Sequence, residues 1–212
     1  METLDHFRSW HGPNDGQPYW TWKEIPTRAK DAGIRVHGHF EDGAALHDAK
    51  AGRRALLLLA ETVDNLNGVL LIRDDDGDDD RENGLDQART NLKVDFPIVV
   101  GLAHVKRECW VLNGFEPCDD KERESLEAIR KELGFYPRLE PHRLTHRGKG
   151  ELRNAKTIVT ALTGDIEERE QNCWQETRLD VLEQRGEHTG LKKYLNEIRK
   201  SLIPLFTGTS AQ

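Results

Sequence analysis

The sequence has no long apolar run. Its longest uninterrupted hydrophobic stretch is Ala55–Ala60, whereas a membrane helix needs roughly 20 consecutive apolar residues. Near the start of the chain, Asp5, His6 and Arg8 stand where a secretory signal would need apolar residues. We therefore expect neither a membrane-spanning nor a secreted protein.

Cysteine is scarce. The chain has three, Cys109, Cys118 and Cys173, and no two of them have the Cys-x-x-Cys spacing of a zinc or redox site. An odd number without paired spacing predicts free thiols in a reducing compartment, and the cytoplasm is the expected location. The same spacing argues against a structural zinc site.

The negative charge is concentrated in one place. The chain has 212 residues, with 31 Lys plus Arg against 38 Asp plus Glu and a formal charge of -7. Six of the acids lie within Asp74–Asp80, so the rest of the chain carries only -1. A nearly neutral chain with one acidic cluster remains a candidate for nucleic-acid binding when metal ions neutralise that cluster.

The hydrophobic pattern of the N-terminal half predicts helices that alternate with strands. It predicts helices over 19–32, 44–65 and 81–92, and strands over 34–40, 68–72 and 96–102, each strand following a helix. The last two strands are continuous aliphatic runs, which are typical of central parallel strands. This order predicts an α/β fold with a small parallel sheet and right-handed crossovers.

The C-terminal half has a helical and highly charged pattern. Helices are predicted over 122–133, 154–162, 165–185 and 191–203. Trp174 and the leucines at helical spacing are core or subunit-contact positions, which leaves an oligomer open. The predicted organisation is an N-terminal arm (1–18), an α/β domain (19–115) and a helical extension or cap (116–212).

Two carboxylates stand directly at a predicted strand end. Asp74 and Asp76 follow the aliphatic strand, and functional groups of parallel sheets gather at such ends, where His104 and Glu108 are also expected. Mg²⁺ typically takes one or two carboxylates together with waters and substrate phosphates. The pair therefore predicts a magnesium site, with a solvated acidic loop as the alternative. For Asp78–Asp80 we favour the solvated loop.

Two other motifs contain a similar run of aspartates. An EF-hand loop starting at Asp74 needs Gly at position six and Glu at position twelve, where the sequence has Asp79 and Leu85. A haloacid-dehalogenase-like phosphatase would use Asp74 as nucleophile and Asp76 as acid. That family places the motif on its first strand and follows Gly with Thr or Val, where Asp78 stands here. The EF-hand is excluded, and the phosphatase remains an alternative.

The order strand, helix, Asp-x-Asp, helix, strand resembles the TOPRIM domain of topoisomerases, primases and overcoming-lysogenization-defect nucleases, over about residues 20 to 115. The stretch Ile98–Leu112 looks like the strand and Glu-x-Trp-x-Leu helix of TOPRIM-like proteins found near ATPases in bacterial defence loci. The resemblance implies a Rossmann-like fold, Mg²⁺ or Mn²⁺ at Asp74 and Asp76, and phosphodiester cleavage by metal-activated water. It also implies an ABC- or SMC-like ATPase partner and a role in antiphage defence.

The sequence departs from the TOPRIM pattern at its start. TOPRIM domains open with a strand that ends in a catalytic Glu, and Met1–Pro18 contains no apolar strand to supply it. Glu41 follows a predicted strand, Glu61 lies in a predicted helix, and Glu108 follows the last strand. We take Glu108 as the third acid and metal ligand, with a helix-capping or ion-paired Glu as the equal alternative. The alternative function is a degenerate, regulatory or binding subunit of a larger complex.

Basic residues supply the predicted contacts to nucleic acid. Lys106, with His104 and Arg107, follows the last strand and is placed to contact a scissile phosphate. The segment 138–156 forms the strongest basic patch and suits sequence-independent binding, with DNA favoured over RNA. Its predicted nucleic-acid-binding residues are Arg143, Arg147, Lys149, Arg153 and Lys156. Solvated surface charge is the alternative for each of them.

Overall fold

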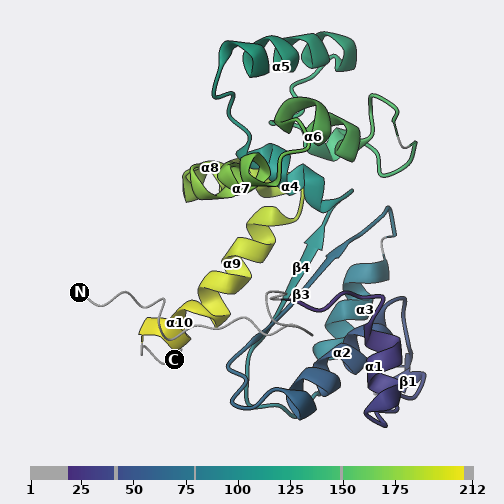
Figure 1. Cartoon of the computed structure of the whole chain (residues 1–212). Coiled ribbons are helices and arrows are strands. Elements are labelled where there is room, and N and C mark those ends of the chain that lie inside the picture. Colours follow the sequence, from purple (N-terminus) through teal and green to yellow (C-terminus); the bar gives the residue numbers. More distant parts are fainter. Residues whose placement is uncertain (1–18, 41–42, 79, 149, 208–212) are drawn as a thin grey trace. The chain divides into compact units, whose positions relative to one another are not determined.

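The computed structural model describes residues 19–40, 43–78, 80–148 and 150–207 (Figure 1). It is a mixed α/β structure with a small parallel sheet and a small antiparallel pair, in agreement with the predicted fold class. Its contacts define two compact units, within Met1–Val69 and Asn83–Phe96, and within Leu70–Glu82 and Pro97–Gln212. The predicted boundary after residue 115 falls inside the second unit, and the predicted arm lies outside the described residues.

The first unit is built on two packed helices, α1 (Ile25–Asp31) and α2 (Ala49–Thr62). Alanine and leucine, which are strong helix formers, dominate α2. Arg53 of α2 donates a hydrogen bond of 2.5 Å to the carbonyl oxygen of Ala88, near the end of α3 (Asp80–Arg89). The bond holds the last turn of α3, where a helix leaves its carbonyl groups without intrahelical partners.

The predicted strand over 34–40 is too long. Only His39–Phe40 (β1) forms a strand, and it pairs antiparallel with Gly43–Ala44 (β2). The predicted helix over 44–65 starts later than expected, at Ala49. Asp48, the residue before it, has φ +62°, and a right-handed helix cannot include a residue in this left-handed conformation.

The second unit contains the parallel pair. β3 (Val69–Asp74) and β4 (Ile98–Ala103) are hydrogen-bonded neighbours, and α3 follows β3 in the sequence. α9 (Leu191–Ser201) packs against β4. Gly101 makes this approach possible, because a Cβ there would lie 2.8 Å from Cδ2 of Tyr194.

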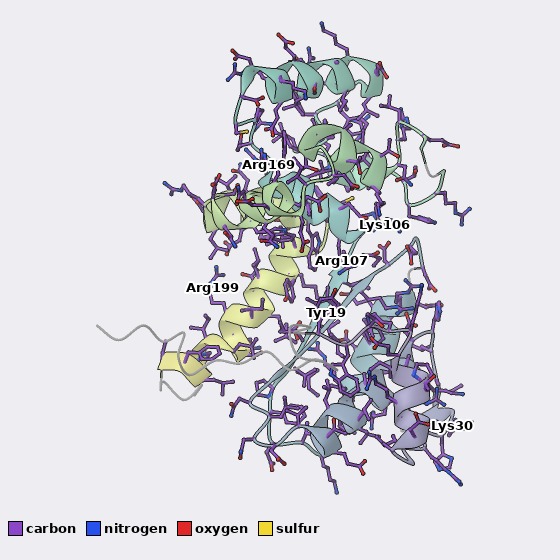
Figure 2. The ribbon with its side chains drawn as sticks, viewed as in Figure 1. Tyr19, Lys30, Lys106, Arg107, Arg169 and Arg199 are labelled. Atoms are coloured by element: carbon purple, nitrogen blue, oxygen red, sulfur yellow. The ribbon has the colours of Figure 1, made fainter. Side chains whose placement is uncertain are left out.

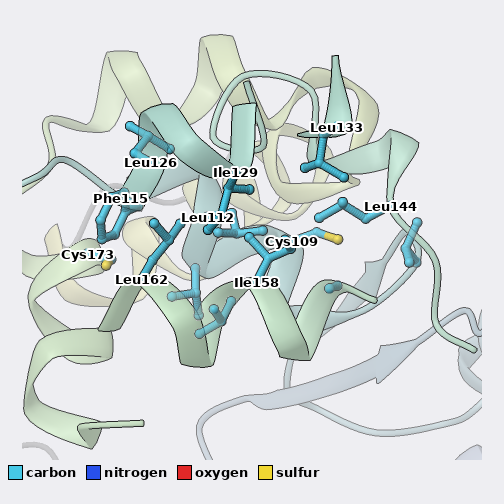
Figure 3. Packing of buried hydrophobic residues seen from close by; sticks show 14 of the residues in the cluster. Cys109, Leu112, Phe115, Leu126, Ile129, Leu133, Leu144, Ile158, Leu162 and Cys173 are labelled. Carbon is cyan, nitrogen blue, oxygen red and sulfur yellow. The ribbon is translucent and has the colours of Figure 1, made fainter. Parts of the chain in front are cut away.

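The core of the second unit surrounds a short buried helix, α4 (Arg107–Gly114). Leu112 of α4 and the adjoining Phe115 pack with Ile129 and Ile158 of the neighbouring helices (Figure 3). The other helices of this unit are α5 (Asp120–Leu133), Pro141–Arg143, α6 (Ala155–Thr163), α7 (Glu167–Gln175), α8 (Leu179–Arg185), Gly186–His188 and α10 (Ile203–Thr207).

The predicted single helix over 165–185 is wrong, because the helix is interrupted between α7 and α8. Thr177 lies in the break, and its hydroxyl group donates a hydrogen bond of 2.6 Å to the carbonyl oxygen of Gly114. This contact, between residues far apart in the sequence, competes with continuation of the helix.

The cysteines are free thiols, as predicted. Burial raises the pKa of Cys109 to about 12 and that of Cys173 to about 11. The thiolate is the reactive form, so both side chains serve as packing groups of the core. Among the described residues, no helix is both long and apolar enough to cross a membrane.

Candidate functional site

Two loops meet where β3 and β4 end. The backbone N–H of Asp75, directly after β3, donates a hydrogen bond of 3.0 Å to the carbonyl oxygen of Ala103, the last residue of β4. Asp76, Gly77 and Val105 have φ values of +49°, +74° and +67°, so both loops turn sharply. The structure places Asp74 and Asp76 close to Lys106, and it places His104 next to Asp75, whereas Glu108, which was also expected here, does not join them.

Asp74 uses one carboxylate oxygen to cap α4. Its Oδ1 accepts a hydrogen bond of 2.9 Å from the backbone N–H of Arg107, the first residue of that helix. A carboxylate is stabilised there by the exposed N–H groups and by the helix dipole. The guanidinium Nε of Arg107 lies 3.6 Å from the same oxygen. The other oxygen, Oδ2, lies 4.0 Å from Nζ of Lys106.

Asp76 is likewise held by one carboxylate oxygen and presents the other to Lys106. Its Oδ2 accepts a hydrogen bond of 2.9 Å from the guanidinium group of Arg81, which also donates to the backbone carbonyl of Asp74. Its Oδ1 lies 3.6 Å from Nζ of Lys106. Desolvation raises the pKa of the Asp76 carboxyl, but the hydrogen bond from Arg81 and the nearby positive charges outweigh it, so the pKa is lowered overall.

Lys106 therefore lies between the two carboxylates. Asp74 and Asp76 each give one oxygen to an arginine or a backbone N–H and present the other to the same ammonium group. Both distances exceed the 2.7–3.2 Å of a direct N–H···O hydrogen bond, so the pairs are loose. Lys106 and Arg107 lie where β4 leads into α4 (Figure 2).

Asp75, between the two predicted ligands, is the aspartate that organises the loops. Its side chain is 10% exposed and accepts hydrogen bonds from His104 Nδ1 (2.5 Å), the Val105 N–H (3.0 Å) and the Gly77 N–H (2.9 Å). Burial raises its pKa, and these three bonds lower it further than burial raises it. The sequence analysis missed this role, because β3 ends at Asp74 and the partner of Asp75, His104, follows a different strand.

A cavity of about 300 Å³ opens beside the Asp75–His104 pair. The loop after β4 lines it on one side, and the loop 144–151 supplies His146, Arg147 and Glu151. Gly77 lets this second loop approach, because a Cβ at Gly77 would lie 3.1 Å from the His146 ring. His146 and Glu151 are functional candidates that the sequence analysis missed, since no motif connects that loop with the aspartates.

The predicted basic patch is exposed on this unit, with mixed roles. Arg143 pairs with Glu140 at 3.0 Å and lies over the ring of Phe135 at 4.2 Å, which gives it a structural role. Arg147 donates a hydrogen bond of 3.0 Å from Nε to Nε2 of His146. The side chains of Arg153 and Lys156 are exposed near the start of α6. Lys149 and the alternative acid Glu41 lie outside the described residues.

Glu108 does not join Asp74 and Asp76 in a metal-binding group. Among the described residues, no three His, Cys, Asp or Glu side chains are close enough to share a metal ion. Glu108 lies in the first turn of α4, where its negative charge contributes to raising the pKa of Glu170 on α7, after desolvation and Asp165. The three-acid set is therefore not assembled here, whereas a two-carboxylate set matches the number of protein ligands that Mg²⁺ commonly takes.

Comparisons with protein-family models, curated proteins and solved structures find no match to this chain. The resemblance to TOPRIM domains rests on the residues described above.

Proposed function

We propose that this chain is a TOPRIM-like, divalent-metal-dependent nuclease that hydrolyses phosphodiester bonds of DNA or RNA at the carboxyl end of β3 and β4. The observation that carries the proposal is that two carboxylate oxygens face the same cation. Asp74 Oδ2 lies 4.0 Å and Asp76 Oδ1 lies 3.6 Å from Nζ of Lys106. A cation and basic side chains at this position can stabilise the negative charge of a phosphodiester in the transition state.

Asp74 and Asp76 would hold Mg²⁺ or Mn²⁺ through these two oxygens. A bound divalent cation neutralises phosphate charge and lowers the pKa of water. The chain itself fixes both carboxylates in advance, because the α4 N-terminus orients Asp74 and Arg81 orients Asp76. Lys106 and the exposed Arg107 side chain then lie beside the carboxylates as phosphate contacts.

The wider role follows from the same resemblance. We propose an effector subunit of a bacterial antiphage system that works with an ABC- or SMC-like ATPase. DNA is the favoured substrate. The exposed Arg147, Arg153 and Lys156 side chains support binding of nucleic acid as contacts to a phosphate backbone.

The test is cleavage by the purified chain, alone and with the product of its adjacent gene. Plasmid DNA and single-stranded RNA are incubated with Mg²⁺, Mn²⁺ or EDTA. Asp74→Asn and Asp76→Asn should abolish metal-dependent cleavage. Asp120→Asn is the matched control, because Asp120 is also paired with an arginine but lies on α5. Undiminished cleavage by the Asp74→Asn, Asp76→Asn double mutant overturns the proposal.

A second candidate has a specific observation in its favour. Lys106, Arg81 and Arg107 already neutralise the two aspartates, and Glu108 is not part of the group. That arrangement suits a regulatory or binding subunit in which Lys106 permanently replaces the metal ion. Unchanged assembly with the ATPase and unchanged function of the complex carrying the double mutant would favour this candidate.

A further inference from the structure

His104 and Asp75 form a carboxylate–imidazole pair. Oδ2 of Asp75 lies 2.5 Å from Nδ1 of His104, and its other oxygen is bound to the N–H groups of Val105 and Gly77. The buried carboxylate is therefore fixed on both sides. An ionised carboxylate only accepts hydrogen bonds, so Nδ1 of the neutral ring carries the hydrogen and Nε2 carries the lone pair.

The ring of His104 lines the cavity of about 300 Å³, and its side chain is 50% exposed. Several charged or titratable groups surround it. Asp75 belongs to the loop after β3, and Lys106 precedes α4. The loop 144–151 contributes His146, Arg147 and Glu151. His142 lies in the short helix after α5. Burial lowers the pKa of His142, and the neighbouring His188 and His104 lower it further.

We infer that His104, oriented by Asp75, is the general base of the phosphodiester hydrolysis, an assignment that rests on the nuclease function proposed above. Nε2 of His104 removes a proton from water as the water oxygen forms a bond to phosphorus. The bond between phosphorus and the leaving sugar oxygen breaks, and that oxygen takes a proton from solvent. Asp75 is a positioning residue, and Arg147 binds a non-bridging phosphate oxygen from the cavity wall.

This assignment supplies a proton acceptor to the site. Attack of water on phosphorus releases a proton that a nearby base can take, and Glu108 does not join the aspartates among the described residues. Histidine is the side chain most often used for such proton transfers. Here the sequence places it one residue after β4, at the strand end that the aspartates also occupy.

The test uses two substrates, plasmid DNA and bis(p-nitrophenyl) phosphate, with Mn²⁺ at pH 7.5. His104→Ala should lower kcat by about 10²- to 10⁴-fold on both substrates, with unchanged Mn²⁺ binding and an unchanged circular dichroism spectrum. Added imidazole should restore part of the activity of His104→Ala, which a purely structural role does not predict. His37→Ala, an exposed histidine of the first unit, is the control and should retain full activity.

Asp75→Asn tests the positioning role. It should lower kcat with little change in KM, and it should move the acid limb of the pH–rate profile to lower pH, because loss of the carboxylate removes a charge that favours the protonated ring. An unmoved profile overturns the role of Asp75.

The outcomes separate this inference from the proposed function. Cleavage by the wild-type protein together with full activity of His104→Ala overturns the general base and leaves the nuclease intact. Loss of DNA cleavage with retained hydrolysis of bis(p-nitrophenyl) phosphate by His104→Ala also overturns it. The p-nitrophenolate leaving group needs no proton, so this result would show that His104 is a general acid and not the general base. Absence of cleavage by the wild-type protein with its partner overturns both proposals.

Discussion

Glu122 and Arg169 form a bidentate ion pair that joins α5 to α7. Both carboxylate oxygens of Glu122 accept hydrogen bonds of 2.8 Å from the guanidinium group of Arg169. The two side chains are only 14% and 13% exposed. The Arg169 hydrogen bonds are the main reason that the pKa of Glu122 is lowered from 4.5 to about 2. The pair is therefore a major electrostatic link within the helical part of the second unit.

Glu122→Gln should lower the free energy of unfolding at pH 7 by about 2 kcal/mol, since hydrogen bonds between charged groups contribute more than neutral ones. A carboxyl with a lowered pKa stabilises the fold fully above its unfolded pKa, here 4.5, and this contribution is lost as the pH falls toward 2. Urea unfolding of the two proteins between pH 7 and pH 2 measures the difference, which should shrink over that interval. Glu124→Gln, an exposed substitution on the same helix, is the control.

Elements with local signals were predictable from the sequence. Helix α5 is bounded by Asp119, whose side chain accepts a hydrogen bond from the Glu122 N–H, and by Gly134 in a left-handed conformation. Both signals are readable in one stretch of sequence. The aliphatic composition of β3 and β4 likewise identified both strands and the loop that carries the aspartates.

Features that depend on distant contacts were not predictable. The break between α7 and α8 depends on Thr177 meeting the Gly114 carbonyl oxygen. The role of Asp75 depends on His104, which follows a different strand. The position of Lys106 between the two carboxylates depends on the sharp turn at Val105 as well as on strand order. The hydrophobic pattern of the sequence does not indicate contacts of this kind.

Asp75 and Asp76 should differ in their contributions to stability. Asp75→Ala leaves the Val105 N–H without its acceptor in a buried loop and should destabilise the protein by about 2–3 kcal/mol. Asp76→Ala removes a side chain that is 41% exposed, and the buried Arg81 keeps its hydrogen bond to the Asp74 carbonyl oxygen, so we expect a smaller loss of about 1 kcal/mol. Thermal and urea unfolding of both variants at pH 7 measure the contrast. Equal losses would show that Asp75 does not organise the loops.

Lys106 should compete with a divalent cation. Lys106→Met removes the ammonium group between Asp74 and Asp76, so Mn²⁺ should bind about tenfold more tightly, as expected when one like charge a few ångströms away is lost. Isothermal titration calorimetry with Mn²⁺ alone measures the affinity, and Lys121→Met on α5 is the control. Nuclease activity should fall in the same variant, because a phosphate contact is lost. An unchanged Mn²⁺ affinity would contradict a cation position shared with Lys106.

Gly114 should not tolerate a side chain, although it lies at the end of a helix where alanine is usually better. A Cβ at this position would lie 2.0 Å from the carbonyl oxygen of Cys173 on α7. Gly114→Ala should therefore destabilise the protein by about 3 kcal/mol, the upper range for overpacking a core. Gly38→Ala is the matched control, since its Cβ would have Lys50 Nζ as nearest neighbour at 3.6 Å. A variant as stable as the control would mean that α7 can move away from α4.

Binding of nucleic acid to the basic patch should depend strongly on salt. Each phosphate contact adds about 0.9 to the slope of log K against log salt for duplex DNA. Arg147→Ala, Arg153→Ala and Lys156→Ala should each reduce that slope by about one contact, with similar effects on unrelated sequences, because phosphate contacts carry no sequence information. Fluorescence anisotropy of labelled duplexes at several salt concentrations measures the slopes. Arg123→Ala on α5, which removes an exposed arginine paired with Asp120, should leave the slope unchanged. If Arg147→Ala, Arg153→Ala and Lys156→Ala also keep the wild-type slope, the patch does not contact DNA, and the metal site must bind its substrate without the patch.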